Sequence, residues 1–279
     1  MQMRAAAIGI VTTSALLLLG YFLLSQAQPS TLPTFVDRGF LSVQRGSAQA
    51  EEAYTILRTP AGWEFSLNTR LIARDKGFES RTQGVLELSP DLQPVRYRTS
   101  RVAQALAEED REVWEINLLW GEVADGQFRL GEEDLVLAEP GAPAKTFSGT
   151  DAIPVRAPWA VLEMDTFSPL GLVPLVLLYA SPSLEEQTVL AVMPLPRRSF
   201  ERTLRRADPV QIVDSATGEA QQAERVLWVR PQEAPPLEIL FRFQSDPLRY
   251  TFLGVAVSGE DRAFVYRKDL FPQGFVVER

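Results

Sequence analysis

The sequence predicts a mainly β fold: one large curved antiparallel sheet with a short apolar plug helix, preceded by an N-terminal apolar helix. Three observations support this prediction. Apolar and polar residues alternate with a period of two in many short runs, turn residues separate those runs, and one uncharged segment interrupts the pattern. The connections are short, whereas a parallel crossover needs about a dozen residues or more, so we expect antiparallel pairing.

The N-terminal segment, residues 1–27, is apolar and carries only Arg4 as a charged residue. As a helix, residues 5–24 would span about 30 Å, the thickness of a bilayer core. The Ser-Gln-Ala sequence at 25–27 also suits a signal peptidase, so a cleaved signal peptide and a retained membrane anchor both remain open. Because Arg4 favours a cytoplasmic N-terminus, we expect the rest of the chain to be exported, in the periplasm or at the outer face of the cytoplasmic membrane.

Residues 28–34 are rich in proline, serine and threonine and indicate a linker, so residues 35–279 are expected to form a single β-rich extracytoplasmic domain. Roughly ten to twelve strands fit the alternating template. The clearest alternating runs are Trp63–Asn68, Val95–Arg98, Trp114–Leu118, Leu237–Ile239 and Phe241–Phe243. Turns are indicated at Ser89-Pro90-Asp91, Asp125-Gly126, Thr217-Gly218 and Ser258-Gly259.

The segment Phe167–Ala180 contains no charged residue and two prolines. It is too short to span a membrane, so we expect a buried short helix that plugs the curved sheet. Asp165 and Ser168 are both suitable N-cap residues for this helix.

The chain contains no histidine and no cysteine. Ser–His and Cys–His nucleophile pairs, zinc sites built from His and Cys, and disulfides are therefore excluded. No phosphate-binding glycine loop or calcium loop occurs, and we expect neither a metal nor a cofactor. The formal net charge of −8 argues against a nucleic-acid partner, because such binding depends on neutralising phosphates.

Carboxylates are the common catalytic groups that remain. They cluster at Glu51-Glu52, Glu108-Glu109-Asp110 and Glu132-Glu133-Asp134. A glycosidase needs two carboxylates that face each other across a substrate, whereas adjacent residues of a strand point to opposite faces. These clusters are more typical of solvated loops, and we do not expect an enzyme.

Five arginines gather between residues 197 and 206. Alternation places Arg202 and Arg206 on one strand face. They are suited to binding an anionic headgroup, although such a run is also typical of a charged edge strand that resists aggregation.

Aromatic residues fall on the apolar phase of several expected strands. Together with the plug helix they form the candidate binding surface, which consists of Trp63, Phe65, Tyr97, Trp114, Leu175, Leu178, Trp228, Phe241 and Phe243, with Arg202 and Arg206 at its rim. Ordinary core packing explains most of these residues equally well. A sheet with one large apolar face must cover that face, and a lipid-like ligand would do so together with the plug.

Three stretches carry a resemblance to known proteins: residues 86–97, the Asp165-Thr166-Phe167-Ser168 sequence followed by Leu178-Tyr179, and residues 208–228. In these stretches the chain resembles bacterial envelope proteins with a lipoprotein-carrier-type half-barrel fold, and within that group a family of unknown function. The resemblance implies a half-barrel whose concave face binds acyl chains, and it implies no catalytic residues.

The leading hypothesis is a non-enzymatic extracytoplasmic protein that binds a lipid-like or amphipathic envelope ligand. A membrane-tethered structural or assembly module that binds another envelope protein is the alternative. A carboxylate-dependent glycan hydrolase is the third hypothesis. An uncleaved N-terminal helix would add the membrane itself as a partner.

Overall fold

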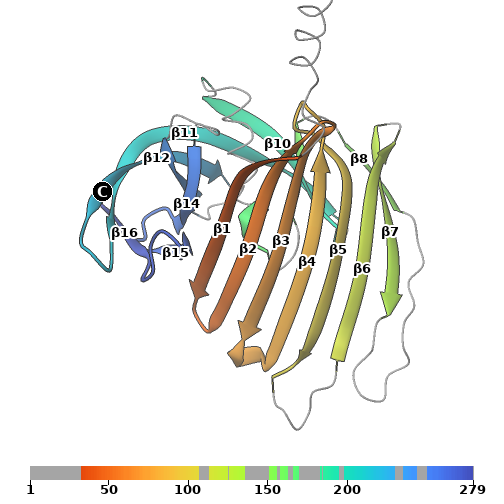
Figure 1. The fold of residues 1–279 in the computed structure, drawn as a ribbon, viewed down its shortest axis with the longest axis horizontal. Coiled ribbons are helices and arrows are strands. Elements are labelled where there is room, and N and C mark those ends of the chain that lie inside the picture. Colours follow the sequence, from red (N-terminus) through yellow and green to blue (C-terminus); the bar gives the residue numbers. More distant parts are fainter. Residues whose placement is uncertain are drawn as a thin grey trace, which may run out of the picture.

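The structure is a computed structural model in which one large β-sheet dominates (Figure 1). It describes residues 33–106, 113–124, 126–135, 151–155, 158–162, 166–169, 183, 185–194, 198–229, 235–243 and 250–278. The mainly β class is confirmed, and the described residues form sixteen strands of one sheet rather than the ten to twelve strands expected.

The strands follow one another closely along the chain. Their bounds are β1 (Thr34–Arg45), β2 (Ala48–Thr59), β3 (Gly62–Ala73), β4 (Phe78–Leu88), β5 (Pro94–Ala105), β6 (Val113–Ala124), β7 (Gln127–Leu135), β8 (Asp151–Pro154), β9 (Trp159–Val161), β10 (Glu186–Met193), β11 (Arg198–Asp214), β12 (Ala220–Val229), β13 (Leu237–Phe243), β14 (Tyr250–Val257), β15 (Ala263–Arg267) and β16 (Phe275–Glu278). A short 3-10 turn, Arg74–Lys76, joins β3 to β4.

The sheet order is β8-β7-β6-β5-β4-β3-β2-β1-β15-β14-β13-β12-β11-β10-β9, and β16 pairs with β11 beside this path. The expectation of purely antiparallel pairing is wrong at one place, because β9 and β10 are parallel. The connection between these two strands runs from residue 162 to residue 185, which is long enough for a parallel crossover. The predicted plug segment lies within this connection.

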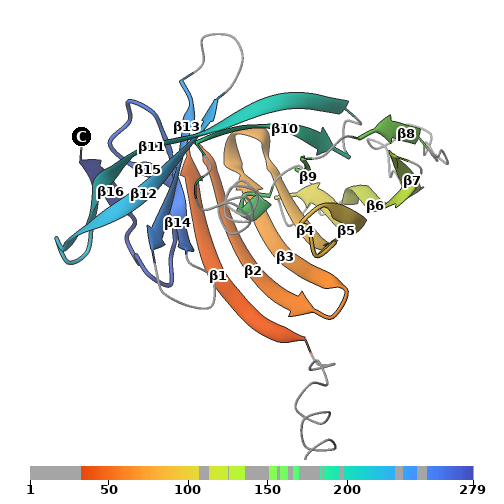
Figure 2. The ribbon, with the colours of Figure 1, turned by 90° about the horizontal axis from the view of Figure 1, so that it is seen from above.

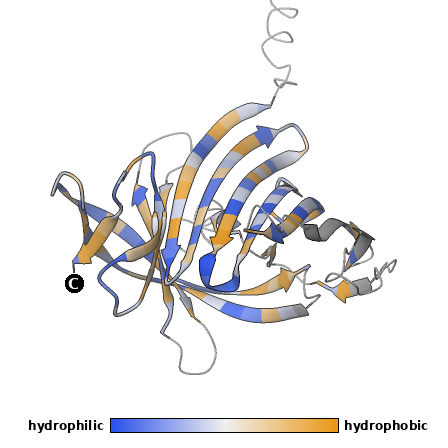
Figure 3. Ribbon diagram, turned by 90° about the horizontal axis from the view of Figure 1, so that it is seen from below, coloured by the Kyte–Doolittle hydropathy of each residue, from blue (hydrophilic) through white to orange (hydrophobic). Residues whose placement is uncertain are grey.

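Alternation explains why these sequences form strands. In β3, residues Trp63, Phe65 and Leu67 are buried, whereas Glu64 and Ser66 between them are partly exposed. The long strands accordingly show alternating hydrophobic and hydrophilic bands (Figure 3). The predicted turn at Ser89-Pro90-Asp91 is present, closed by a 2.9 Å hydrogen bond from the Leu92 N–H to the Ser89 carbonyl.

The sheet curves strongly, so that the long strands β1–β5 and the strands β10–β14 enclose a common interior (Figure 2). The main buried cluster draws side chains from both parts, for example Tyr54 and Phe65 from one and Trp228 and Phe241 from the other. A second, smaller cluster covers the opposite face of β12–β15, where Phe271 and Phe275 of the C-terminal segment pack on Leu240 and Leu253. Strands β13 and β14 are therefore buried on both faces.

The two parts of the sheet meet at the junction of β1 and β15, where only three residue pairs are in register. Arg267, which is 5% exposed, spans this junction. Its guanidinium donates to both carboxylate oxygens of Asp269, at 2.8 and 2.6 Å, to the Tyr54 hydroxyl at 2.9 Å and to the Arg38 carbonyl at 2.8 Å. Asp37 accepts a hydrogen bond from the Tyr54 hydroxyl at 3.0 Å and completes a partly buried network across β1.

Gly39 has no side chain, and the Arg267 guanidinium occupies the space that a side chain would fill. A Cβ at this position would lie about 2.6 Å from the Arg267 Nε atom and 2.5 Å from the Tyr54 ring. Glycine on β1 therefore lets the guanidinium lie directly over the strand.

Among the residues that the structure describes, no helix is long and apolar enough to cross a membrane. The N-terminal segment 1–27 lies outside those residues, so the predicted N-terminal helix is not tested. Of the predicted plug, only Phe167, Ser168 and Pro169 are described, and the plug helix stays a prediction.

We predict that Arg267→Gln destabilises the protein by about 2–3 kcal/mol, because it removes a buried guanidinium that binds the partly exposed carboxylates of Asp37 and Asp269 and leaves the buried Tyr54 hydroxyl without one of its partners. Urea unfolding followed by tryptophan fluorescence measures this loss. Arg96→Gln is the control: Arg96 pairs with Glu87 at 3.5 Å, both side chains are exposed, and the loss of this pair is expected to cost about 1 kcal/mol or less. Equal losses in the two variants would show that the junction network contributes no more than a surface ion pair.

Candidate functional site

The concave face of β2–β5 is a regular grid of side chains. Strand register aligns inward-facing residues of the four strands in rows, and successive rows are about 6.8 Å apart along the strands. Three neighbouring rows form the candidate site: the apolar row (Ile56, Phe65, Leu86, Tyr97), the glycine row (Tyr54, Leu67, Gly84, Thr99) and the polar row (Glu52, Thr69, Thr82, Arg101).

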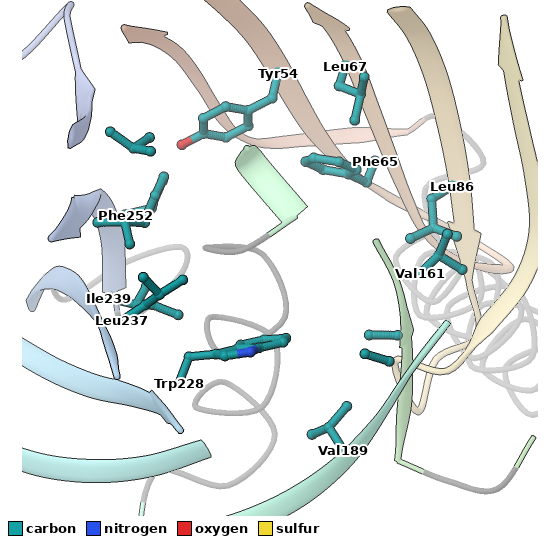
Figure 4. Close-up of a cluster of buried hydrophobic side chains, with 14 of the residues drawn as sticks. Tyr54, Phe65, Leu67, Leu86, Val161, Val189, Trp228, Leu237, Ile239 and Phe252 are labelled. Atoms are coloured by element: carbon teal, nitrogen blue, oxygen red, sulfur yellow. The ribbon is translucent and has the colours of Figure 1, made fainter. Parts of the chain in front are cut away.

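The apolar row faces side chains of the other part of the sheet across the interior. Figure 4 shows Phe65 and Leu86 on one side, Trp228 and Phe252 on the other, and Val161 of β9 close to Leu86. All these residues belong to the main buried cluster. The apolar row is therefore one wall of an enclosed apolar interior.

A small cavity adjoins the glycine row. It has a volume of about 20 Å³ and is lined by Phe65, Leu67, Gly84, Val85, Leu86, Tyr97, Thr99, Val161 and Pro169. It exists because Gly84 has no side chain to fill the concave face. A volume of this size holds about one water molecule, and its lining is almost entirely apolar.

Glu52 is fully buried on the concave side of β2. Its Oε2 atom accepts hydrogen bonds from the Thr69 hydroxyl at 2.7 Å and from the Phe167 N–H at 2.8 Å. Its Oε1 atom accepts the Ser168 N–H at 2.6 Å. Glu52 thus fixes the start of the predicted plug segment to the sheet, a position for which the sequence had suggested Asp165 or Ser168 as local caps.

Burial raises the pKa of Glu52 above its ordinary value of 4.5, and the hydrogen bonds from Ser168, Thr69 and Phe167 oppose this rise. The carboxyl group is costly to ionise here because the groups that bond to it are neutral. The anchor between the sheet and the plug segment is therefore sensitive to protonation.

The structure places the predicted binding residues unevenly. Trp63, Phe65, Tyr97, Trp228 and Phe241 are buried together in the main cluster, each no more than 7% exposed. Phe243 is instead 62% exposed at the end of β13, where its ring lies 5.7 Å from that of Tyr250.

Three further predicted binding residues are not tested. Trp114 lies in β6, whose side chains at this point are outside the described structure, and Leu175 and Leu178 are outside the described residues altogether.

Arg202 and Arg206 lie on β11 on either side of the buried Leu204. Arg206 is bound to Glu224, with 2.9 Å between its Nη2 atom and the carboxylate. The Arg202 guanidinium lies 3.9 Å from the centre of the Phe200 ring. Both guanidinium groups therefore have contacts within the chain. These contacts fit the interpretation of this run as a charged strand surface.

Of the predicted carboxylate clusters, only Glu51-Glu52 has described side chains. The two residues point to opposite faces of β2 and not into a solvated loop: Glu51 is exposed and pairs with Lys268 at 2.8 Å, whereas Glu52 faces the interior. In the part of the chain that the structure describes, no group of three or more His, Cys, Asp or Glu residues is placed to hold a metal ion.

Sequence reasoning missed the polar row and the role of Glu52. The signal that reveals them is strand register, because alternation alone marks Thr69 and Thr82 as inward-facing without showing that they align with Glu52. The contact between Glu52 and Ser168 joins residues 116 positions apart.

No protein-family model matches the sequence, and no curated protein matches it. Among solved structures, the chain is similar to the crystal structure of a beta-barrel-like protein of the domain of unknown function DUF1849 from Brucella abortus. The TM-score is 0.47 at 10% identity, covering 81% of this chain and 90% of that chain. At this TM-score the likeness assigns no function to the chain.

We predict that Glu52→Gln changes how stability depends on pH. Because the folded-state pKa of Glu52 is raised, the stability that its protonated form contributes is complete below about pH 4.5 and is lost as the pH rises through the folded-state pKa. Glutamine does not titrate. Between about pH 4.5 and the folded-state pKa of Glu52, the free energy of unfolding of the wild type relative to Glu52→Gln is therefore expected to fall by about 1.4 kcal/mol for each pH unit.

Urea unfolding of both proteins at a series of pH values measures the difference. Glu51→Gln, at the neighbouring exposed position, serves as the control and is expected to leave the pH profile almost unchanged. A flat difference between the wild type and Glu52→Gln would contradict the assignment of a raised pKa to Glu52.

Proposed function

We propose that this chain is a non-enzymatic binding protein that holds the apolar part of a lipid-like envelope molecule against the concave face of its sheet. The observation that carries this proposal is the enclosed interior, where aromatic and aliphatic side chains from both parts of one curved sheet face each other (Figure 4). Apolar burial of about 0.8 kcal/mol per methylene would supply most of the affinity.

The cavity beside Gly84 is too small for an acyl chain. Ligand entry therefore requires residues 166–169 to move away from the glycine row, where Pro169 lines the cavity. The described start of this segment is attached to β2 by two hydrogen bonds to Glu52, from the Phe167 and Ser168 N–H groups. We propose that ligand and plug compete for the same wall.

A binding role also fits the state of the buried acids. Glu52 accepts hydrogen bonds from three donors. Glu79 is bound by the guanidinium groups of Arg70 and Arg81. Asp37 accepts a hydrogen bond from Tyr54 and forms an ion pair with Arg267. Glu238 lies 3.6 Å from Arg225. A carboxylate-dependent hydrolase needs an acid and a base that are aimed at a substrate, and these acids have structural partners instead.

The proposed location follows from the N-terminal sequence. The apolar segment 1–27 would export the domain and, if uncleaved, would tether it to the outer face of the cytoplasmic membrane. A tethered binding protein would meet its ligand at the membrane surface.

Tryptophan quenching by a brominated acyl chain tests the proposal. Trp63, Trp159 and Trp228 are all buried in the main cluster, so dibromostearate that enters the interior is expected to quench the fluorescence of the full chain, whereas stearate is not. Gly84→Leu, which fills the concave face next to the cavity, is expected to weaken the quenching titration about tenfold.

Gln83→Leu is the matched control, since Gln83 is the exposed neighbour on the opposite face of β4. Absence of quenching at saturating dibromostearate would refute the proposed function. Equal quenching of the wild type and Gly84→Leu would refute the proposed binding wall.

A further inference from the structure

The polar row crosses the concave face between more apolar positions. Glu52, Thr69, Thr82 and Arg101 are in register on β2, β3, β4 and β5, and none is more than 7% exposed. Polar side chains that are buried in a row on an otherwise apolar surface are costly unless they are hydrogen-bonded. The row therefore calls for a specific explanation.

Half of the row is explained by the plug. The Thr69 hydroxyl donates to Glu52, and Glu52 binds the backbone of Phe167 and Ser168. The other two residues of the row are Thr82 and Arg101, which are directly opposite each other on β4 and β5. Arg101 interacts with another residue of the chain, so the group that needs an explanation is the Thr82 hydroxyl.

The Thr82 hydroxyl lacks a partner. Its Oγ1 atom is buried, Thr82 is only 1% exposed, and no hydrogen bond is made to this atom. An orphaned hydroxyl of this kind is uncommon in a native interior and marks a place where a further polar group fits. It faces the same interior as the glycine row, because Thr82 and Gly84 are two residues apart on one strand.

Arg101 brings a positive charge to the position directly opposite Thr82. A guanidinium carries five N–H donors in a fixed fork and can serve more than one acceptor at a time. Thr82 adds one O–H donor beside it. Both groups suit an acceptor with several oxygens and a negative charge, such as a carboxylate or a phosphate.

An apolar surface extends from this pair of donors. Along the strands, the glycine row and the apolar row follow the polar row, and Trp63 and Leu88 form the next position. Three row spacings amount to about 20 Å, comparable to the length of a long extended acyl chain.

We propose that Thr82 and Arg101 form the headgroup site of the interior and select single-chain amphiphiles with a terminal anionic group, whose acyl chain lies along the glycine and apolar rows. This inference rests on the proposed function and deepens it by naming the ligand class. Arg202 and Arg206, which the sequence suggested for a headgroup, lie on β11 and are not part of this site.

Equilibrium dialysis of the full chain in mild detergent tests the proposal with three probes of equal chain length: palmitate, hexadecyl phosphate and hexadecanol. For each probe, the apparent dissociation constant of a variant is divided by that of the wild type, so that partitioning of the probe into detergent cancels. We expect the wild type to bind at least one of the two anionic probes about tenfold more tightly than hexadecanol, since hydrogen bonds to charged groups are stronger than neutral ones. Which anion binds more tightly distinguishes a carboxylate from a phosphate ligand.

Two substitutions locate the site. Arg101→Met is expected to weaken binding of the preferred anion about tenfold, and Thr82→Val about threefold, with hexadecanol binding unchanged. Arg101→Lys and Thr82→Ser retain the donor groups and are expected to retain most of the preference, which separates loss of the site from loss of the fold. Arg98→Met, at an exposed position on the opposite face of β5, is the matched control.

The outcomes distinguish the two proposals. Equal affinity for all three probes, unchanged in Arg101→Met and Thr82→Val, would overturn the headgroup site and leave the proposed function standing. No binding of any probe to the wild type would overturn the proposed function and the headgroup site together.

Discussion

The fold depends on one topological constraint: β8 and β9 follow each other in the chain, yet they form the two opposite edges of the sheet. Four residues, 155–158, separate them, and a fully extended link of this length spans at most about 18 Å. The sheet must therefore curl until its edges approach, and Trp159 of β9 does lie 5.2 Å from the Phe128 ring of β7. Curling encloses the interior and brings the two edges of the sheet near each other, although β8 and β9 are not paired in the sheet order.

Because the interior is enclosed, polar groups on the concave face are shielded from water and are costly unless they are hydrogen-bonded. On an open sheet, a threonine or glutamate on the apolar face would be hydrated and of little consequence. Inside a closed interior each one needs a partner, and Glu52 finds its partners in Thr69 and in the connection that follows β9. The constraint that brings β9 to the far edge also brings residues 167–169, shortly after it, onto the concave face. Topology and the polar row are therefore parts of one arrangement.

Local pattern was sufficient for the strands and turns. The alternation in Trp63–Asn68 and the Ser89-Pro90-Asp91 turn depend on neighbouring residues, and the structure contains both. Phe243 differs because β13 ends there and its ring leaves the interior, although it continues the phase of Phe241. The Glu52 anchor and the parallel β9–β10 pair depend on partners that are remote in sequence. Periodicity carries no information about such distances, so neither was predicted.

The narrow junction between β1 and β15 has a mechanical consequence. Three residue pairs join β1 to β15, whereas eleven join β1 to β2. A pulling force applied through the N-terminal segment reaches the sheet at β1 and is carried mainly into β2 and its neighbours. Strand β15 is joined by three residue pairs to β1 and by three to β14, so the weak line under load lies beside β15, where Arg267 adds hydrogen bonds to Arg38 of β1 and Tyr54 of β2. A chain stretched between a membrane and a bound partner would part beside β15 first.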